Sequence, residues 1–374
     1  MRVGIFYPTL NVYGGAEFVT FAMANTLANN KKEVILFVNK EINQKEIMKF
    51  FGASLHPSVK IIVMPSKVSP RGLLDFYQTI FRSFILKSKC DLWIDVYSNC
   101  VYPWTNILYV HFPYINSFLF RKNFPYLKSG RLRHVGIFPY VFFERNLIDY
   151  GGKMIIANSH YTAEEIRKMK NVKVEVLYPP VPSVIFEENP NILFRNPRKN
   201  LVVTISRFDS GKGLEKIPFI ASLTNPKIKF VIIGRVHCKK TFFYLQKLIN
   251  KLKLSERVKI FPDISKEELK KILRISKIYL HTAIGEHFGI SVVEAMAAGC
   301  IPIVHNSGGV KEYVPPEFRY NNIKEAVEKI ENEIQEWNPK KAKEMMEISK
   351  EFSEYNFSNK FLKLFTKYVR EKVS

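Results

Sequence analysis

Residues 278–304 read IYLHTAIGEHFGISVVEAMAAGCIPIV, and their pattern decides the fold class. The apolar runs 278–282 and 301–304 predict two short strands, and the small residues between Gly289 and Gly299 predict the helix that joins them. Gly299 suits the end of this helix, because glycine readily adopts the left-handed conformation that follows many last helical turns. A strand, a helix and a second strand joined by short loops form the repeating unit of a parallel sheet.

The same alternation continues through the rest of the chain. Further strands are expected at residues 3–7, 33–38, 60–64, 92–96, 106–111, 154–158, 174–178, 201–206, 229–233 and 258–261. Apolar residues on one stripe predict a helix after Gly15, and Thr162 with Glu165 three residues later predicts a helix that opens with a capping box.

One stretch of the chain fits no regular element. Residues 178–197 are rich in proline and polar side chains, which is typical of a boundary between domains. We therefore predict an α/β protein with two Rossmann-like, doubly wound parallel-sheet domains, residues 1–182 and 183–354. A C-terminal helix at 355–374 is expected to pack back on the first domain.

The charge balance predicts an anionic partner. The 374 residues include 57 Lys and Arg against 34 Asp and Glu, a net charge of +23. Nucleic acid, an anionic membrane surface or phosphorylated small molecules would satisfy this charge, and solvated lysines on an ordinary surface are the alternative. The four cysteines form no C-x-x-C pair, which fits a reducing compartment and predicts neither a zinc site nor a disulfide framework.

The sequence contains no apolar stretch approaching the eighteen or so residues of a membrane span. The N-terminal run 3–7 is too short for a signal peptide and is expected to form the first strand. We therefore expect a cytoplasmic protein whose contact with a membrane, if any, is peripheral.

Three segments with suitable chemistry follow predicted strands, where ligands of open parallel sheets bind. Gly14 and Gly15 precede a helix whose N–H groups could face an anion, although a plain strand-to-helix turn explains them equally well. Arg207 and Lys212 lie on a glycine-bearing loop that suits a diphosphate, or that simply forms surface salt bridges. The third segment is 285–299, which contains the helix predicted between Gly289 and Gly299.

Two carboxylates flank the start of that helix, Glu286 in the loop and Glu294 one turn inside it. Glu286 could merely complement the helix dipole while Glu294 makes a solvent-exposed pair. The acid and nucleophile of a glycosidase are another reading, which requires both carboxylates to lie across one scissile bond. The sequence spacing alone leaves these alternatives open.

Glu286 and Glu294, with Phe288 and Gly289 between them, resemble the E-x7-E signature of the retaining glycosyltransferases of family 4. Three further segments resemble the family in its order along the chain: GGAE at 14–17, YPPV at 178–181 and SRFDSGKG at 206–213. The resemblance therefore spans nearly the whole chain. It implies the GT-B fold, in which two Rossmann-like domains face each other across a cleft.

Within the family, the closest resemblance is to the α-1,2-mannosyltransferases that extend dolichol-diphosphate oligosaccharides. The segments that carry it are YVHFPY at 109–114, EHFG at 286–289 and IVHNSGG at 303–309. This implies transfer of a hexose, mannose above all, from a nucleotide diphosphate sugar to a lipid-linked glycan. GDP-mannose is favoured over a UDP-sugar as donor; a UDP-sugar with a soluble or glycolipid acceptor, or a catalytically silent GT-B binding protein, remain the alternatives.

The resemblance also implies roles for residues of the second domain. Arg207 and Lys212 would bind the donor diphosphate, Glu286 the sugar hydroxyls and Glu294 the ribose hydroxyls. The backbone of the helix start would complete the donor site, at Phe288, Gly289 and Ile290. The departing diphosphate develops negative charge that the site must stabilise. We expect the catalytic residues to be Arg207, Lys212, Glu286 and His111.

In the first domain, the resemblance places His111 beside the transferred sugar and Gly14 and Gly15 against phosphate and acceptor. No Asp-x-Asp metal motif lies near these segments. We therefore expect no metal cofactor, with Arg207 and Lys212 taking the place of a metal ion.

Two tracts combine basic and aromatic residues, 71–89 and 118–143. Such composition suits a surface that dips into anionic lipid headgroups, while ordinary core packing would also use the aromatic residues. Single-stranded nucleic acid could stack on these rings, but no nucleic-acid motif is present, so no nucleic-acid partner is expected. The interpretation is peripheral contact with the cytoplasmic face of an anionic membrane.

Overall fold

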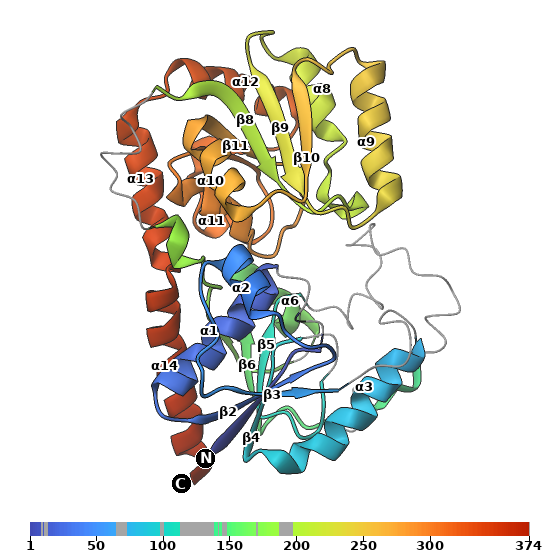
Figure 1. Ribbon diagram of the computed structural model, residues 1–374. Helices are drawn as coiled ribbons and strands as arrows, with labels where there is room; N and C mark the ends of the chain where they lie inside the picture. The colour runs from blue at the N-terminus through green and yellow to red at the C-terminus, as the bar shows by residue number, and fades with distance from the viewer. Residues whose placement is uncertain are drawn as a thin grey trace. The chain divides into compact units, whose positions relative to one another are not determined.

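The computed structural model describes residues 1–8, 10, 14–64, 73–97, 101–112, 138–140, 142–143, 148–169, 171–186 and 197–373. The chain divides into two compact units, Met1–Pro180 with Glu354–Ser374, and Val181–Ser353 (Figure 1). Each unit contains one sheet of parallel strands with helices packed around it. The predicted fold class, two doubly wound parallel sheets, is therefore confirmed.

The first unit is built on a seven-stranded sheet in the order β3-β2-β1-β4-β5-β6-β7. Its strands are β1 (Arg2–Phe6), β2 (Glu33–Val38), β3 (Lys60–Val63), β4 (Leu92–Asp95), β5 (Ile107–Val110), β6 (Met154–Ala157) and β7 (Val174–Val176). Its helices include α1 (Gly15–Asn29), α2 (Gln44–Phe51), α3 (Leu73–Leu86), α6 (His160–Met169) and α14 (Glu354–Val373). In the register, Val3 of β1 lies between Val34 of β2 and Leu92 of β4.

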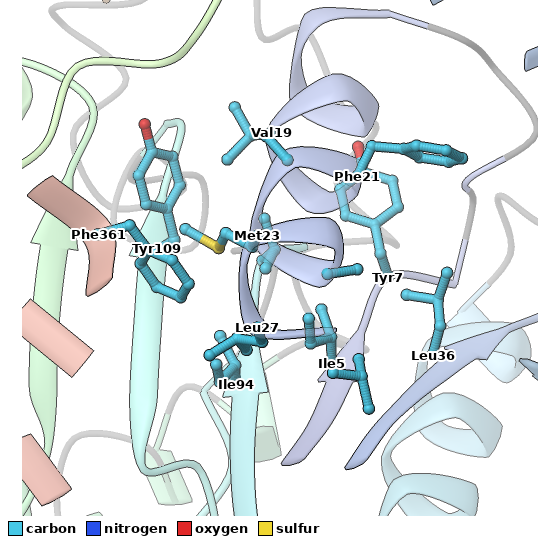
Figure 2. Packing of buried hydrophobic residues seen from close by; sticks show 14 of the residues in the cluster. Ile5, Tyr7, Val19, Phe21, Met23, Leu27, Leu36, Ile94, Tyr109 and Phe361 are labelled. Atoms are coloured by element: carbon cyan, nitrogen blue, oxygen red, sulfur yellow. The ribbon is translucent and has the colours of Figure 1, made fainter. Parts of the chain in front are cut away.

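Helix α1 is buried on nearly all sides, because the sheet covers one face and α14 packs against it. Figure 2 shows Met23 and Leu27 of α1 with Ile94 and Tyr109 of the sheet and Phe361 of α14 in one apolar cluster. A helix buried in this way is apolar around most of its circumference, as the sequence of α1 is. The last segment of the chain thus completes the core of the first unit.

The predicted start of the helix near Thr162 was wrong. Helix α6 begins at His160, two residues earlier. Its cap is Ser159, whose Oγ accepts a hydrogen bond from the Thr162 backbone N–H at 3.0 Å. Ser159 and Thr162 are both good capping residues, and Ser159 occupies the cap because β6 ends at Ala157 and the chain turns there.

The second unit is built on a six-stranded sheet in the order β10-β9-β8-β11-β12-β13. Its strands are β8 (Lys199–Ile205), β9 (Lys229–Gly234), β10 (Val258–Pro262), β11 (Ser276–His281), β12 (Ile301–His305) and the short β13 (Arg319–Tyr320). Its helices are α8 (Lys216–Leu223), α9 (Lys239–Lys251), α10 (Lys266–Ile275), α11 (Ile290–Ala297), α12 (Ile323–Gln335) and α13 (Pro339–Ser349).

The order of these strands fixes where a ligand site can form. From β8 the chain runs outward through β9 and β10, and it returns to the other side of β8 with β11. The loops after β8 and β11 therefore leave neighbouring strands in opposite directions and open a crevice between them. The crevice lies at the segments that carry Lys212 and Glu286.

Candidate active site

Two glycines let the loops at the ends of β8, β11 and β12 pack backbone against backbone. Gly213 has φ +63°, and a Cβ there would lie 2.7 Å from the Thr282 carbonyl oxygen. Gly308 has φ +78°, and a Cβ there would lie 2.3 Å from the Glu286 carbonyl oxygen. Only glycine fits both the conformation and the space at these positions, so the loops can approach closely enough to bring their side chains together.

Lys212 and Glu286 meet at this junction. The Lys212 Nζ donates to Glu286 Oε2 at 2.6 Å, and both side chains are largely shielded from solvent. The Thr282 hydroxyl donates to the Lys212 carbonyl at 2.9 Å, which ties the loop after β8 to the end of β11. The Gly309 N–H donates to the Glu286 carbonyl at 2.7 Å from the third loop.

His281 is the second partner of the Glu286 carboxylate. It is the last residue of β11, it is buried, and its Nε2 lies 3.4 Å from Glu286 Oε2. Burial raises the pKa of Glu286, but the charge of Lys212 and the interaction with His281 outweigh this effect and hold the pKa well below its usual value. Glu286 is therefore a carboxylate at neutral pH, with Oε2 held by two groups.

The start of α11 is shaped by Gly289 and Tyr313. Gly289 caps the helix with φ +86°, which confirms the expected need for glycine there. The Phe288 ring is buried against Tyr313 and Phe352, with ring centroids 5.2 and 5.3 Å away. The Tyr313 hydroxyl donates to the Phe288 carbonyl at 2.7 Å. Because the Phe288 side chain points into the core, this residue can serve a ligand only through its backbone.

Ile290 is the first residue of α11, and Glu294 lies one turn further on. The leading N–H groups of a helix have no partner within the helix, and they carry its positive dipole end. The Glu294 carboxylate is almost fully buried and pairs with the Lys266 ammonium through Oε1. The two glutamates of the signature are thus each held by a lysine from another element.

Arg207 lies in the loop after β8, as expected, but its side chain is exposed. Within the described residues, no hydrogen bond or ion pair holds the guanidinium. The structure therefore brings the side chains of Lys212 and Glu286 together, whereas the side chain of Arg207 is exposed at the surface.

In the first unit, Gly14 caps α1 and Gly15 is its first residue. The Gly14 N–H donates to Glu17 Oε2 at 2.9 Å, and the Tyr7 hydroxyl donates to the other oxygen of Glu17 at 3.1 Å. The buried Glu17 thus occupies one of the N–H groups that the sequence suggested for an anion.

His111 follows β5 in the same unit. Its ring lies 4.9 Å from that of Tyr109, and the Asn158 side chain donates to its carbonyl at 3.0 Å. Burial lowers the pKa of His111 to about 3, against the opposing effect of a hydrogen bond with the Val96 backbone. At neutral pH the imidazole is therefore uncharged.

Sequence reasoning missed His281 and Lys266. His281 has a local signal, since it is a polar residue that directly follows the apolar buried residues 278–280 of the strand. Lys266 has none, because it is one lysine among several in a charged amphipathic helix. Its contact with Glu294 spans 28 positions and depends on the fold bringing the start of α10 to α11.

Metal-binding clusters and membrane-spanning helices are both absent from the described part of the chain. Within it, no group of three or more His, Cys, Asp or Glu side chains is arranged to hold a metal ion. No helix there combines the length and the apolar character needed to cross a membrane.

Comparison with known proteins shows which sequences and structures this chain is similar to. Residues 185–352 match the family described as glycosyl transferases group 1. A GDP-Man:Man(3)GlcNAc(2)-PP-Dol alpha-1,2-mannosyltransferase of Dictyostelium discoideum is 29% identical over 293 residues, which cover 68% of this chain and 57% of the relative. The protein of that name from Homo sapiens is 26% identical over 367 residues, 83% of this chain and 73% of the relative.

The chain thus corresponds to little more than half of the Dictyostelium protein's length. Among solved structures, sucrose-phosphate synthase from Thermosynechococcus elongatus superposes with a TM-score of 0.77 over 99% of this chain and 100% of its own, at 14% identity. The predicted resemblance, both to the family and to its α-1,2-mannosyltransferase branch, is confirmed by these matches. The chain has the GT-B fold, and its residues 185–352 match the glycosyl transferases group 1 family.

Proposed function

We propose that this protein is a retaining glycosyltransferase that moves mannose from GDP-mannose onto a glycan linked to a polyprenyl or dolichyl diphosphate. The observation that carries the proposal is the 2.6 Å contact of Lys212 with Glu286 at the crevice between β8 and β11. The contact lies within the group 1 domain. The choice of donor and acceptor follows the names of the relatives, which cite GDP-Man and a PP-Dol glycan.

The electrostatics of the crevice suit departure of a nucleoside diphosphate. As the bond from the sugar to the phosphate breaks, negative charge grows on the leaving oxygen and positive charge grows on the anomeric carbon. Lys212, Arg207 and the N-terminus of α11 would face the first charge. An ammonium has three N–H donors, so Lys212 can keep its contact with Glu286 and also donate to the diphosphate.

Glu286 would bind the hydroxyls of the transferred sugar. Its Oε2 is held by Lys212 and His281, which leaves Oε1 to accept from a ligand. Because the pKa of Glu286 is held well below its usual value, this oxygen remains an acceptor at neutral pH. Glu294 would bind the ribose, and His111, an uncharged imidazole, would lie beside the transferred sugar. Gly14 and Gly15 would approach the phosphate and the acceptor.

The proposed acceptor lies at a membrane, and one surface of the first unit suits the cytoplasmic face of an anionic bilayer. Phe81, Phe84 and Ile85 of α3 are 64%, 48% and 55% exposed. Lys87 and Lys89 follow them at the end of the helix. Of the second basic and aromatic tract, residues 118–137 and 141 lie outside the described residues, while Phe138, Phe142 and Phe143 are exposed.

The direct test is transfer of radiolabelled mannose from GDP-mannose to a Man(3)GlcNAc(2) glycan on a polyprenyl diphosphate, with EDTA present throughout. We expect transfer without added metal. Lys212→Ala should reduce turnover by roughly a hundredfold to a thousandfold, because a preorganised donor to the leaving group is lost. Its effect on donor affinity should be smaller, since the charge grows toward the transition state.

Glu286→Ala provides the matched comparison. It should abolish transfer while leaving GDP affinity nearly unchanged, since its partners are sugar hydroxyls. Activity that EDTA removes and manganese restores would overturn the metal-free mechanism. A chain that binds UDP-glucose but not GDP-mannose would overturn the choice of donor.

A further inference from the structure

Glu294 depends on a partner from a different helix. The Lys266 Nζ donates to Glu294 Oε1, and the exposed fractions of the two side chains are 16% and 10%. Burying a carboxylate so shielded from water is costly unless a charged or hydrogen-bonding partner compensates it. Lys266 thus fixes Oε1 of Glu294, and because the carboxylate is planar, this contact restricts where Oε2 points.

The backbone of Lys266 is itself held in place. Lys266 is the first residue of α10, and Ser265 caps this helix. The Ser265 N–H donates to Glu268 Oε2 at 2.9 Å, and the Glu268 N–H donates back to Ser265 Oγ at 3.2 Å. This reciprocal capping box fixes the first turn of α10, and with it the point from which the lysine reaches Glu294.

The other ends of the two helices are joined as well. Arg198 is buried and donates from Nη1 to the carbonyls of Leu273 and Ser276, at 3.1 and 2.6 Å, where α10 ends. Its Nη2 donates to the carbonyl of Ala298, where α11 ends. Helices α10 and α11 are therefore linked at one end by Arg198 and further along by Lys266 with Glu294, which limits sliding between them.

We propose that Lys266 is a positioning residue that determines ribose recognition, by holding Oε1 of Glu294 so that Oε2 accepts from the 2′- and 3′-hydroxyls of the donor nucleotide. The inference rests on the proposed function, in which Glu294 binds the ribose. Without Lys266, the shielded carboxylate would lose the group that orients Oε1, and it could turn away from the geometry of a paired acceptor.

The test compares the affinity of the full chain for GDP and for 2′,3′-dideoxy-GDP by calorimetry. The wild-type chain should prefer GDP roughly tenfold or more, the value of a hydrogen bond to a charged acceptor. Lys266→Met should bring this ratio close to one, and Lys266→Arg should restore most of it. If the Met variant does not fold, Lys266→Ala, which also removes both the charge and the donor, gives the same comparison.

Lys271→Met is the matched control, because Lys271 is an exposed lysine of the same helix. It should leave the ratio unchanged while removing the same charge. A purely structural lysine would alter stability or the affinity for both ligands together. If the ratio of the affinities for GDP and 2′,3′-dideoxy-GDP is the same in Lys266→Met as in the wild type, the inference is overturned. Equal binding of both ligands by the wild type overturns the ribose role of Glu294 and the inference with it, whereas absence of any GDP binding overturns the proposed function itself.

Discussion

At the scale of single residues, the site depends on glycine positions, where no side chain fits, as much as on its charged side chains. The Gly308 backbone lies against the backbone of Glu286, with φ +78°. The nearest atoms to an added Cβ would be the carbonyl oxygen and the nitrogen of Glu286, at 2.3 and 2.7 Å. Backbone atoms cannot move aside as the end of a flexible side chain can. The position of the Glu286 carboxylate is therefore set partly by this glycine.

We accordingly expect Gly308→Ala to lower the free energy of unfolding by about 1–3 kcal/mol and to impair mannose transfer through displacement of Glu286. Urea denaturation and the transfer assay measure the two effects. Gly152→Ala is the control, since a Cβ there meets only the Lys372 ammonium at 3.2 Å, the end of a flexible side chain. Wild-type stability and activity in the Gly308 variant would show that the loops are not held as closely as described.

At the scale of elements, α3 has an outer face that exposes large apolar side chains. Its buried or half-buried side includes Tyr77 and Ile80, which contact the cluster around Trp93. Its outer side exposes Phe81, Phe84 and Ile85. Lys87 lies 4.4 Å from the centre of the Phe84 ring, so a cation stands beside the apolar surface. This combination suits the interface of an anionic bilayer.

Replacing Phe81, Phe84 and Ile85 together by Ser should therefore weaken binding to anionic vesicles while leaving stability nearly unchanged. Each lysine near the bilayer surface contributes about 1 kcal/mol, so binding should also weaken with salt. Liposome flotation with anionic and neutral vesicles measures both. The control replaces Phe243 and Tyr244 of α9, which are also exposed aromatic residues, by Ser. Equal loss in both variants, or no vesicle binding by the wild type, would refute a membrane role for α3.

At the scale of the whole molecule, both units bury histidines that are neutral in the folded state. Burial lowers the pKa of His111 in the first unit to about 3 and that of His287 in the second to about 4. For His287, the charge of Glu286 opposes this shift and that of Lys212 adds to it. The ordinary pKa of histidine is 6.5, so between pH 6.5 and 4 the unfolded chain binds more protons than the folded one. Stability therefore falls as the pH falls through this window.

We expect the urea midpoint, followed by circular dichroism, to decrease steadily from pH 7 to pH 4.5. His287→Gln should flatten this decrease by roughly 1–3 kcal/mol, since it removes one of the titrating groups. Measurements at pH 7 give the baseline, where the imidazole is neutral in both states. A pH dependence identical in the wild type and the variant would mean that His287 is not neutral in the folded chain.

Part of this architecture could be predicted from the sequence because it depends on local pattern. Apolar runs such as 301–304 predict buried strands, and glycines such as Gly289 and Gly299 mark the ends of α11, where the structure has φ +86° and +79°. The spacing of Glu286 and Glu294 carried the family resemblance. These features depend on residues that are neighbours along the chain, so the sequence alone is enough to predict their conformation.

What only the tertiary structure decided involves residues far apart in the chain. The pairing of Lys212 with Glu286 spans 74 positions, and it follows from β11 lying beside β8. Lys266 reaches Glu294 only because the fold brings the start of α10 to α11. The sequence by itself determined the two sheets and most of their helices, and it predicted which residues could serve a glycosyltransferase site. The strand order and helix packing decided which of those charges meet, because a contact between distant residues depends on the whole fold and leaves no periodic signal in the chain.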